Sequence, residues 1–237
     1  ADRMSAVARA GLREALQAGA TALQLELSAA QIDQLLDYLE LLQKWNQVYN
    51  LTAVREPAEM LTHHLLDSLA VIAPLRRHTQ GRAVRLLDVG SGGGLPGVVV
   101  AICCPEIDVN CVDTVAKKAA FVQQVAASLR LANLHGLHAR VETLHAEQGD
   151  GYDVVCARAF ASLADFVQWS RAALRPGGVW LAMKGKQPAD EIAALPPWVE
   201  VFHVEPLQVP GLHAERCIVW LRERAQVAQA GAPNPAC

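Results

Sequence analysis

The feature that most constrains the fold is a glycine-rich segment, residues 88–97, which contains five glycines and one proline. A short β-rich run, Val84 to Val89, precedes it, and a helix is predicted after it over Pro96 to Cys104. Glycines at such a turn permit positive φ angles and let a ligand lie against bare backbone. The free N–H groups of the helix's first turn bind anions. This order of elements is typical of open α/β sheets, which bind ligands at the carboxyl ends of their strands.

The rest of the chain alternates strands and helices at the spacing of a parallel sheet. Further strands are predicted over residues 107–113, 134–141, 152–158, 179–184, 199–205 and 216–222, and further helices over 115–131 and 162–174. Because the last two strands lack a full helix between them, one of them is expected to be antiparallel, in a hairpin at the sheet edge. We therefore predict an α/β fold in residues 81–224, with a doubly wound, mostly parallel, seven-stranded, Rossmann-like sheet.

Two helical stretches precede this domain. Ser28 and Gln31 form a capping-box pattern, after which apolar residues recur every three or four positions as far as Val48. Pro57 suits the first turn of a second helix, whose apolar stripe extends to Ile72. We predict that residues 1–80 form an N-terminal helical segment packed on the sheet, and that residues 225–237 form a loose tail.

Composition excludes several classes of protein. A formal net charge of −3 is unlike that of a general nucleic-acid coat, although it permits a local basic patch. No apolar run reaches the roughly 18–20 residues of a membrane span, and residues 1–13 lack the apolar core of a signal peptide. The six cysteines show no CxxC pair, and the histidines lack a matching ligand set. We expect a cytoplasmic protein without a metal or a membrane partner.

Two cofactors compete for the glycine-rich segment. A dinucleotide is suggested because residues 92–97 match G-x-G-x-x-G and Asp113 follows about twenty residues later. However, no Tyr-x-x-x-Lys or His–carboxylate pair for hydride transfer follows the segment. Asp88 would also repel a pyrophosphate, whereas it suits a cationic methionyl group. An NAD-linked oxidoreductase remains the second hypothesis.

S-Adenosylmethionine is favoured by the pattern D-x-G-x-G-x-G, formed by Asp88, Gly90, Gly92 and Gly94. Residues 174–181 also match the turn and strand that commonly close a methyltransferase sheet. The fold is therefore expected to be that of a class I methyltransferase. At the end of the second strand, Asp113 can accept hydrogen bonds from both ribose hydroxyls. Alternatively, it only caps the helix predicted from Val115 onward.

Seven motifs then occur in one order along the chain. They are residues 44–55, 64–68, 88–97, 140–142, 158–161, 184–185 and 207–211. From about residue 28 to 222, the sequence closely resembles the bacterial ribosomal RNA small subunit methyltransferase G family, also called glucose-inhibited division protein B. It departs from the family pattern at His63, where arginine is usual, and at Gly93 and Cys217.

The resemblance implies methyl transfer from S-adenosylmethionine to N7 of a guanine in 16S ribosomal RNA, free or within the small ribosomal subunit. Matched position by position, it places cofactor contacts at Gly90, Leu95, Val141, Glu142 and Arg158. The residues proposed to bind cofactor are thus Asp88, Gly90, Gly92, Gly94, Leu95, Asp113, Val141, Glu142 and Arg158. A non-catalytic ribosome-assembly factor is the alternative that keeps the fold without turnover. We expect a monomer.

The chemistry of guanine sets what catalysis requires. Its N7 carries an unprotonated lone pair at neutral pH, so no general base is expected, and the protein's task is positioning and electrostatics. Arg158 is expected to orient the base or a phosphate, or else to pair with an acid such as Asp88. Candidate RNA contacts are Lys44, Asn50, Arg55, His64, Arg158, Lys184 and Lys186. All of them except Asn50 and Arg158 are alternatively solvated surface charges, and Asn50 alternatively caps the preceding helix.

Overall fold

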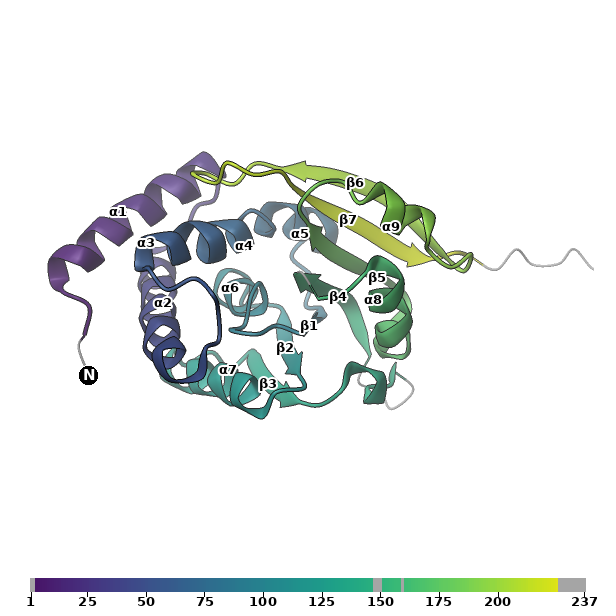
Figure 1. Cartoon of the computed structure of the whole chain (residues 1–237), viewed down its shortest axis with the longest axis horizontal. Coiled ribbons are helices and arrows are strands. Elements are labelled where there is room, and N and C mark those ends of the chain that lie inside the picture. Colours follow the sequence, from purple (N-terminus) through teal and green to yellow (C-terminus); the bar gives the residue numbers. More distant parts are fainter. Residues whose placement is uncertain (1–2, 147–150, 159, 226–237) are drawn as a thin grey trace, which may run out of the picture.

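The computed structural model describes residues 3–146, 151–158 and 160–225. Its sheet has seven strands in the order β3-β2-β1-β4-β5-β7-β6 (Figure 1). Their bounds are β1 Arg85–Val89, β2 Asp108–Asp113, β3 Leu134–His138, β4 Tyr152–Arg158, β5 Leu174–Lys184, β6 Val199–Leu207 and β7 Arg216–Glu223. Strands β1 to β5 pair in parallel, whereas β7 is antiparallel to both β5 and β6. The predicted doubly wound sheet with an edge hairpin is confirmed. The predicted tail lies outside the described residues beyond 225.

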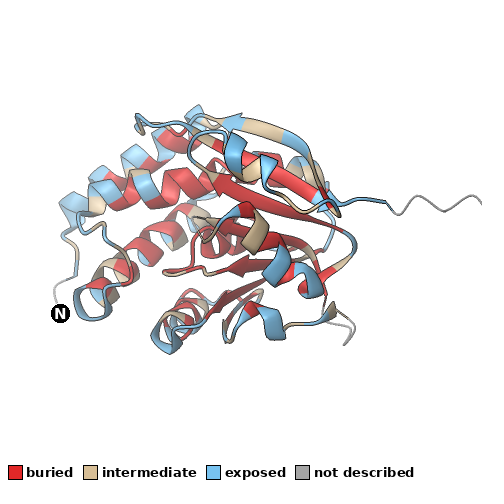
Figure 2. Ribbon diagram, turned by 45° about the vertical axis from the view of Figure 1, so that its right-hand side comes forward, coloured by how far each residue is buried: buried red, intermediate tan, exposed pale blue. Residues whose placement is uncertain are grey.

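Successive side chains of each strand point to opposite faces of the sheet, and in the central strands both sets are apolar, so helices cover both faces. Leu86 and Val154 face a core shared with α6 (Gly97–Cys103) and α7 (Ala116–Ser128). Leu87 and Val155 face a second core, shared with α8 (Leu163–Ser170). In Figure 2, buried residues fill the central strands and the inward helix faces, whereas the edge strand β6 is mostly intermediate or exposed. A short helix, α9 (Ala189–Ala193), follows β5 and was not predicted.

The N-terminal segment is a layer of helices outside α6 and α7. It comprises α1 (Ala6–Ala22), α2 (Ala29–Tyr49), α3 (Pro57–Met60), a π-helical stretch (Leu61–Leu66), α4 (Asp67–Leu69) and α5 (Ile72–Thr79). The capping box of Ser28 and Gln31 is present. Helix α2 packs between α1 on one side and α6 and α7 on the other, whereas α5 reaches the sheet, where the His78 ring lies 5.3 Å from that of Trp220.

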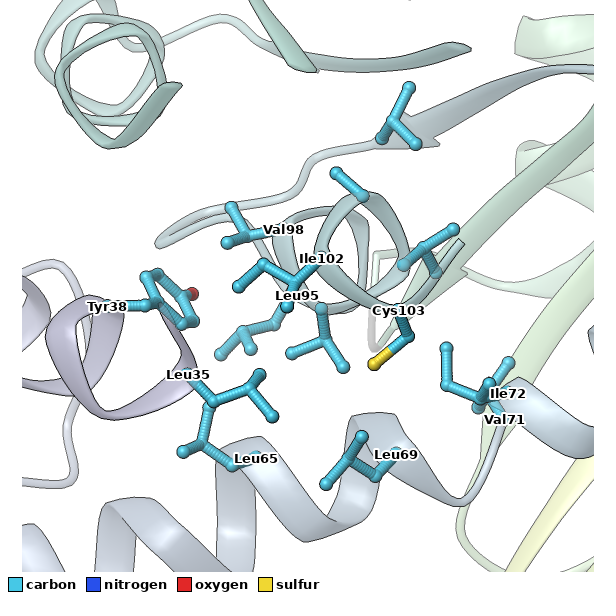
Figure 3. Packing of buried hydrophobic residues seen from close by; sticks show 14 of the residues in the cluster. Leu35, Tyr38, Leu65, Leu69, Val71, Ile72, Leu95, Val98, Ile102 and Cys103 are labelled. Carbon is cyan, nitrogen blue, oxygen red and sulfur yellow. The ribbon is translucent and has the colours of Figure 1, made fainter. Parts of the chain in front are cut away.

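Figure 3 shows the contact between this layer and α6. Leu35 of α2 lies next to Leu65, with Tyr38 and Leu69 to either side, and all four side chains belong to one core with Ile102 of α6. Each of these side chains is buried. Burying a leucine contributes about 1.5–3 kcal/mol. The helical layer is therefore part of the same core as the sheet.

Three local predictions were incomplete. The sequence reading omitted α1, which Ser5 caps and which buries Leu12 and Leu16. Its many alanines hide the apolar period, although the spacing of four between the leucines is a usable signal. Strand β5 begins at Leu174 rather than Val179, because residues 175–178 form a bulge within the strand instead of ending the preceding helix. Strand β3 ends at His138 rather than at residue 141.

Two further properties concern the whole described part of the chain. Its five cysteines, at positions 103, 104, 111, 156 and 217, are all buried and unpaired. Within residues 3–146, 151–158 and 160–225, the helices lack the combination of length and apolar character that a membrane crossing requires.

Candidate active site

The side chains that could take part in binding or catalysis meet at the carboxyl edge of the sheet. Asp113, Arg158 and Lys184 are the last residues of β2, β4 and β5. Because β7 runs antiparallel and pairs Cys217 with Lys184, its first residue, Arg216, lies at the same edge. The glycine-rich segment leaves β1 there. This edge therefore gathers the loop, one acid and three cationic side chains.

The backbone of the glycine-rich segment has the conformation that its sequence requires. Gly90, Gly92 and Gly94 have φ angles of 64°, 57° and 90°. A Cβ on Gly92 would find no heavy atom nearer than the Leu51 carbonyl oxygen, at 4.0 Å. Open space next to bare backbone is what a ligand bound by main-chain groups needs.

The loop is braced by α2 of the N-terminal layer. The buried Tyr38 hydroxyl donates a hydrogen bond of 2.5 Å to the Gly93 carbonyl. The Leu42 side chain lies directly behind Gly93, where a Cβ would come within 2.8 Å of it. The N-terminal segment thus fixes the loop, a role that periodicity alone did not reveal for Tyr38.

Asp88 lies beneath the loop rather than at its surface. Its side chain is fully buried, and its Oδ2 accepts a hydrogen bond of 2.8 Å from the Gly97 N–H. Burial raises the pKa of the Asp88 carboxyl well above its usual range, which favours the neutral acid. The sequence argument gave Asp88 a charge facing a cationic ligand. The structure instead gives it a bracing role at the start of α6.

Asp113 contacts the loop directly. Its Oδ2 accepts a hydrogen bond of 3.1 Å from the Gly92 N–H, and its Oδ1 accepts one of 2.9 Å from the Val115 N–H. The second bond forms a turn ahead of α7, close to the capping role that was the alternative reading. A carboxylate has about four acceptor sites, so both oxygens retain capacity for a diol.

The remaining predicted cofactor residues lie in the glycine-rich loop itself and in the turn after β3. Leu95 is buried in the core, so only its main chain can meet a ligand. Val141 is buried at the start of a one-turn 3-10 helix, Val141–Thr143, and Glu142 within that turn is exposed. The site can therefore hold a cofactor with main-chain groups of the loop, the Asp113 carboxylate and the turn after β3.

Arg158 is held by an acid, but that acid is Asp67 and not the Asp88 that the sequence argument suggested. Its NH1 lies 3.3 Å from Asp67 Oδ2 and donates a bond of 2.9 Å to the His63 carbonyl. Asp67 Oδ1 accepts a bond of 3.2 Å from Arg216. One buried carboxylate thus orients two guanidinium groups, and their combined charge leaves one excess positive charge. Sequence reasoning missed Asp67 and Arg216, although Asp67 stands in the quoted motif 64–68.

His64 is a positioning residue rather than an exposed contact. It is 5% exposed, and its ring nitrogens lie 3.2 Å from Arg158 NH2 and 2.7 Å from Thr52 Oγ1. Arginine can only donate, so Nδ1 accepts and Nε2 carries the proton that it donates to Thr52. Burial, and then the Arg158 guanidinium, lowers the pKa of His64 to about 4. The imidazole is therefore neutral at physiological pH.

This environment makes the fold acid-sensitive. Between the unfolded pKa of about 6.5 and the folded value, only the unfolded state binds the proton, so stability falls as pH drops through that window. At pH 5 the loss from His64 is about 2 kcal/mol relative to pH 7. We expect His64→Gln to remove this part of the pH dependence in denaturant titrations. The matched variant at the exposed His213 should keep the wild-type slope; equal slopes in both variants would contradict the assignment.

Lys184 anchors the turn between β4 and α8. Its Nζ donates bonds of 2.9 Å to the Ala161 carbonyl and 3.0 Å to Glu191 Oε1. The same Glu191 oxygen accepts a bond of 3.0 Å from the Leu163 N–H. The ammonium is thus engaged within the protein, unlike the exposed side chains of Lys44 and Lys186.

Asn50 and Arg55 are exposed and contact each other. Asn50 ends α2 in a left-handed conformation, and its Oδ1 accepts a bond of 3.1 Å from Arg55 NH2. They flank the 51–54 loop, whose Leu51 carbonyl faces Gly92. These two candidates therefore belong to a loop that borders the glycine-rich segment.

Besides this edge, a metal site or a surface depression in the described part of the chain could bind a ligand. Across the described ranges, no group of three or more His, Cys, Asp or Glu side chains is arranged to hold a metal ion. An open depression of about 550 Å³ lies toward the amino ends of β2 and β3, beside Gln34, Arg130 and Asn133. Gln34 and Asn133 use their amides to hold main-chain carbonyls. The carboxyl edge remains the candidate active site.

Comparison with known proteins identifies the family of this chain. The family model described as rRNA small subunit methyltransferase G matches residues 31–219. The protein of that name from Acidovorax ebreus (strain TPSY) is 70% identical, with 92% of this chain and 99% of that protein covered. The one from Paracidovorax citrulli (strain AAC00-1) is 65% identical, with coverages of 95% and 96%.

Solved structures agree with the fold. TrmN from Thermus thermophilus has a TM-score of 0.50 at 17% identity, with 92% of this chain and 79% of that chain covered. The resemblance inferred from the seven motifs is confirmed by the family match. The chain belongs to the rRNA small subunit methyltransferase G family and is a methyltransferase that uses S-adenosylmethionine.

Proposed function

We propose that this protein transfers the methyl group of S-adenosylmethionine to N7 of one guanine in 16S ribosomal RNA. One observation carries the proposal: a braced D-x-G-x-G-x-G loop lies at the same sheet edge as two guanidinium groups held by Asp67. Such a site combines a cofactor cradle with cationic groups for RNA. The small ribosomal subunit or its free RNA is the partner, and the protein acts as a cytoplasmic monomer.

The reaction needs positioning more than proton transfer. Bound S-adenosylmethionine supplies an electrophilic methyl group on a cationic sulfur. Guanine N7 would accept this methyl group through its lone pair, with S-adenosylhomocysteine as the leaving group and the positive charge passing to the guanine ring. No proton moves in this step, so the chain needs no general base. Its residues hold nucleophile and methyl group in line and exclude water.

We assign the cofactor to the loop side of the edge. The main chain at Gly90, Gly92 and Gly94 lines the cradle, and Asp113 accepts hydrogen bonds from the ribose hydroxyls. Val141, Glu142 and the main chain of Leu95 complete the proposed set of cofactor contacts. Asp88 acts from beneath the loop by holding Gly97.

We assign the RNA to the cationic side of the edge. Arg158 and Arg216 hold a phosphate or the base edge, because each guanidinium keeps N–H groups beyond those bonded to Asp67. Arg55 and Asn50 extend this surface along the 51–54 loop. Lys44 and Lys186 add exposed charge, whereas His64 and Lys184 position their neighbours.

The Asp113 assignment leads to a quantitative prediction. Removing the carboxylate eliminates two charge-assisted hydrogen bonds to ribose, each of about 1.5–3 kcal/mol. We expect Asp113→Ala to raise the dissociation constant of S-adenosylmethionine at least tenfold in calorimetric titrations. The dissociation constant of Asp113→Asn, which keeps one acceptor oxygen, should lie between those of the wild type and Asp113→Ala. An unchanged affinity in Asp113→Ala would mean that the residue only shapes the turn before α7.

The function is tested by labelled methyl transfer. Methyl-tritiated S-adenosylmethionine is supplied with unmodified small subunits and, separately, with naked 16S RNA. The product is then mapped by strand cleavage specific for N7-methylguanine. A single cleavage site supports the proposal, and the better substrate identifies the physiological partner. Cofactor binding without incorporation into either substrate would favour the assembly-factor hypothesis.

A further inference from the structure

One aromatic residue beside the site has no role in the function so far described. Phe160 lies two residues beyond Arg158, in the turn between β4 and α8, and is half-buried. Its ring covers Gly90, so closely that its Cδ2 fills the space where a Cβ on residue 90 would stand. Phe160 therefore stands between the cofactor loop and the end of β4.

The ring is backed by a second, more exposed aromatic. Trp169 of α8 lies edge-to-face against Phe160, with centroids 5.8 Å apart and an interplanar angle of 83°. Trp169 is 41% exposed, although tryptophan is highly buried on average. Phe166 supports Phe160 from the core side, with centroids 6.4 Å apart. We call Phe160 and Trp169 the aromatic pair.

Two charged side chains fix the main chain next to Phe160. Lys184 donates to the Ala161 carbonyl, and Glu191 accepts from the Leu163 N–H, so the chain directly after Phe160 is fixed. Both anchors are charged groups, which form stronger hydrogen bonds than neutral ones. Lys184, one of the candidate RNA contacts, thus also anchors the turn that carries Phe160.

We propose that Phe160, backed by Trp169, is the face on which the target guanine stacks during methylation. This inference rests on the proposed function. A base stacked there lies next to Gly90, and hence next to the cofactor, with Arg158 on the same strand end to hold its edge. Aromatic faces bind bases through stacking, and they attract cations through the ring quadrupole. Because the guanine ring gains positive charge as the N–C bond forms, the aromatic face favours the transition state over the substrate.

The test compares variants in steady-state methylation of unmodified small subunits. Phe160→Leu keeps an apolar side chain but loses the π face. We expect it to lower kcat/KM for the subunit at least tenfold, within the range of base–aromatic stacking. The dissociation constant of S-adenosylmethionine should stay within twofold of wild type. Phe160→Tyr should restore most of the activity, and the matched control Phe202→Leu, on the distant edge strand β6, should behave as wild type.

Two results would overturn the proposal. One is an unchanged kcat/KM for the subunit in Phe160→Leu; the other is a loss explained entirely by weaker cofactor binding, which would make Phe160 a brace for Gly90. If Phe160→Leu does not fold, Trp169→Leu carries the same comparison, because that side chain is partly exposed. The wild-type reaction separates the two hypotheses: no guanine methylation by the wild type refutes the proposed function, whereas equal methylation by the variant refutes stacking alone.

Discussion

Replacing Arg158 by alanine should reduce kcat/KM for the RNA substrate by about 100-fold or more, because the two charge-assisted hydrogen bonds that its guanidinium donates to the RNA are lost. The same change removes one of the two cations around Asp67, whose side chain is only 4% exposed. Affinity for S-adenosylmethionine should change by less than a factor of about five, a difference below 1 kcal/mol. Methylation kinetics at saturating cofactor, together with calorimetry, separate the two effects.

Arg158→Lys is the matched control. Lysine keeps the charge but presents a single ammonium, which cannot reproduce the fork that meets Asp67, His64 and the His63 carbonyl. Its activity should therefore fall between those of alanine and arginine. If Arg158→Ala lost cofactor affinity tenfold with normal turnover at saturation, Arg158 would belong to the cofactor site instead.

Replacing Gly97 by alanine should disable the loop itself. Gly97 opens α6, and an added Cβ would collide with Cys111 Sγ and lie 2.9 Å from Asp88 Oδ2. Neither neighbour can retreat, because both side chains are buried under the loop. We expect a loss of about 3 kcal/mol in the free energy of unfolding, which lowers Tm by roughly 10 °C. Cofactor binding should fall with it, since Asp88 would lose its hold on the Gly97 N–H.

Two comparisons isolate the cause of this effect. Gly11→Ala in α1 adds the same methyl group where no heavy atom lies within 4 Å, and should stabilise the protein by up to about 1 kcal/mol. Adding Cys111→Ala to Gly97→Ala removes the sulfur and should recover part of the lost stability. A Gly97→Ala protein with wild-type Tm would show that the packing around Asp88 is looser than the structure indicates.

Local sequence signals predicted most of the fold. The capping box at Ser28, the short β-rich runs and the glycine-rich turn each have a short-range cause, so they can be predicted without tertiary information. The alanine-rich helix α1 and the bulge at residues 175–178 depend on packing and strand pairing, which short windows do not show. These are the places where the prediction was incomplete.

The sequence predicted which residues belong to the candidate site better than it predicted which of them contact one another. The motif pattern identified Asp88, Asp113 and Arg158, but only the register of β5 and β7 brings Arg216 to the same edge. Likewise, Asp67 and Arg158 are separated by about ninety residues, so their ion pair follows from the placement of the N-terminal layer. Burial then decided that His64 positions Arg158 instead of facing solvent.

The central claim is attack by guanine N7, and removing that atom tests it most directly. Two preparations of 16S RNA, one with guanosine and one with 7-deazaguanosine, are assembled into small subunits and supplied with methyl-tritiated S-adenosylmethionine. We expect label in the guanosine subunits and none in the 7-deaza subunits, because the latter have carbon in place of the nucleophile. Equal incorporation into both would contradict methylation at N7 and place the acceptor elsewhere on the RNA.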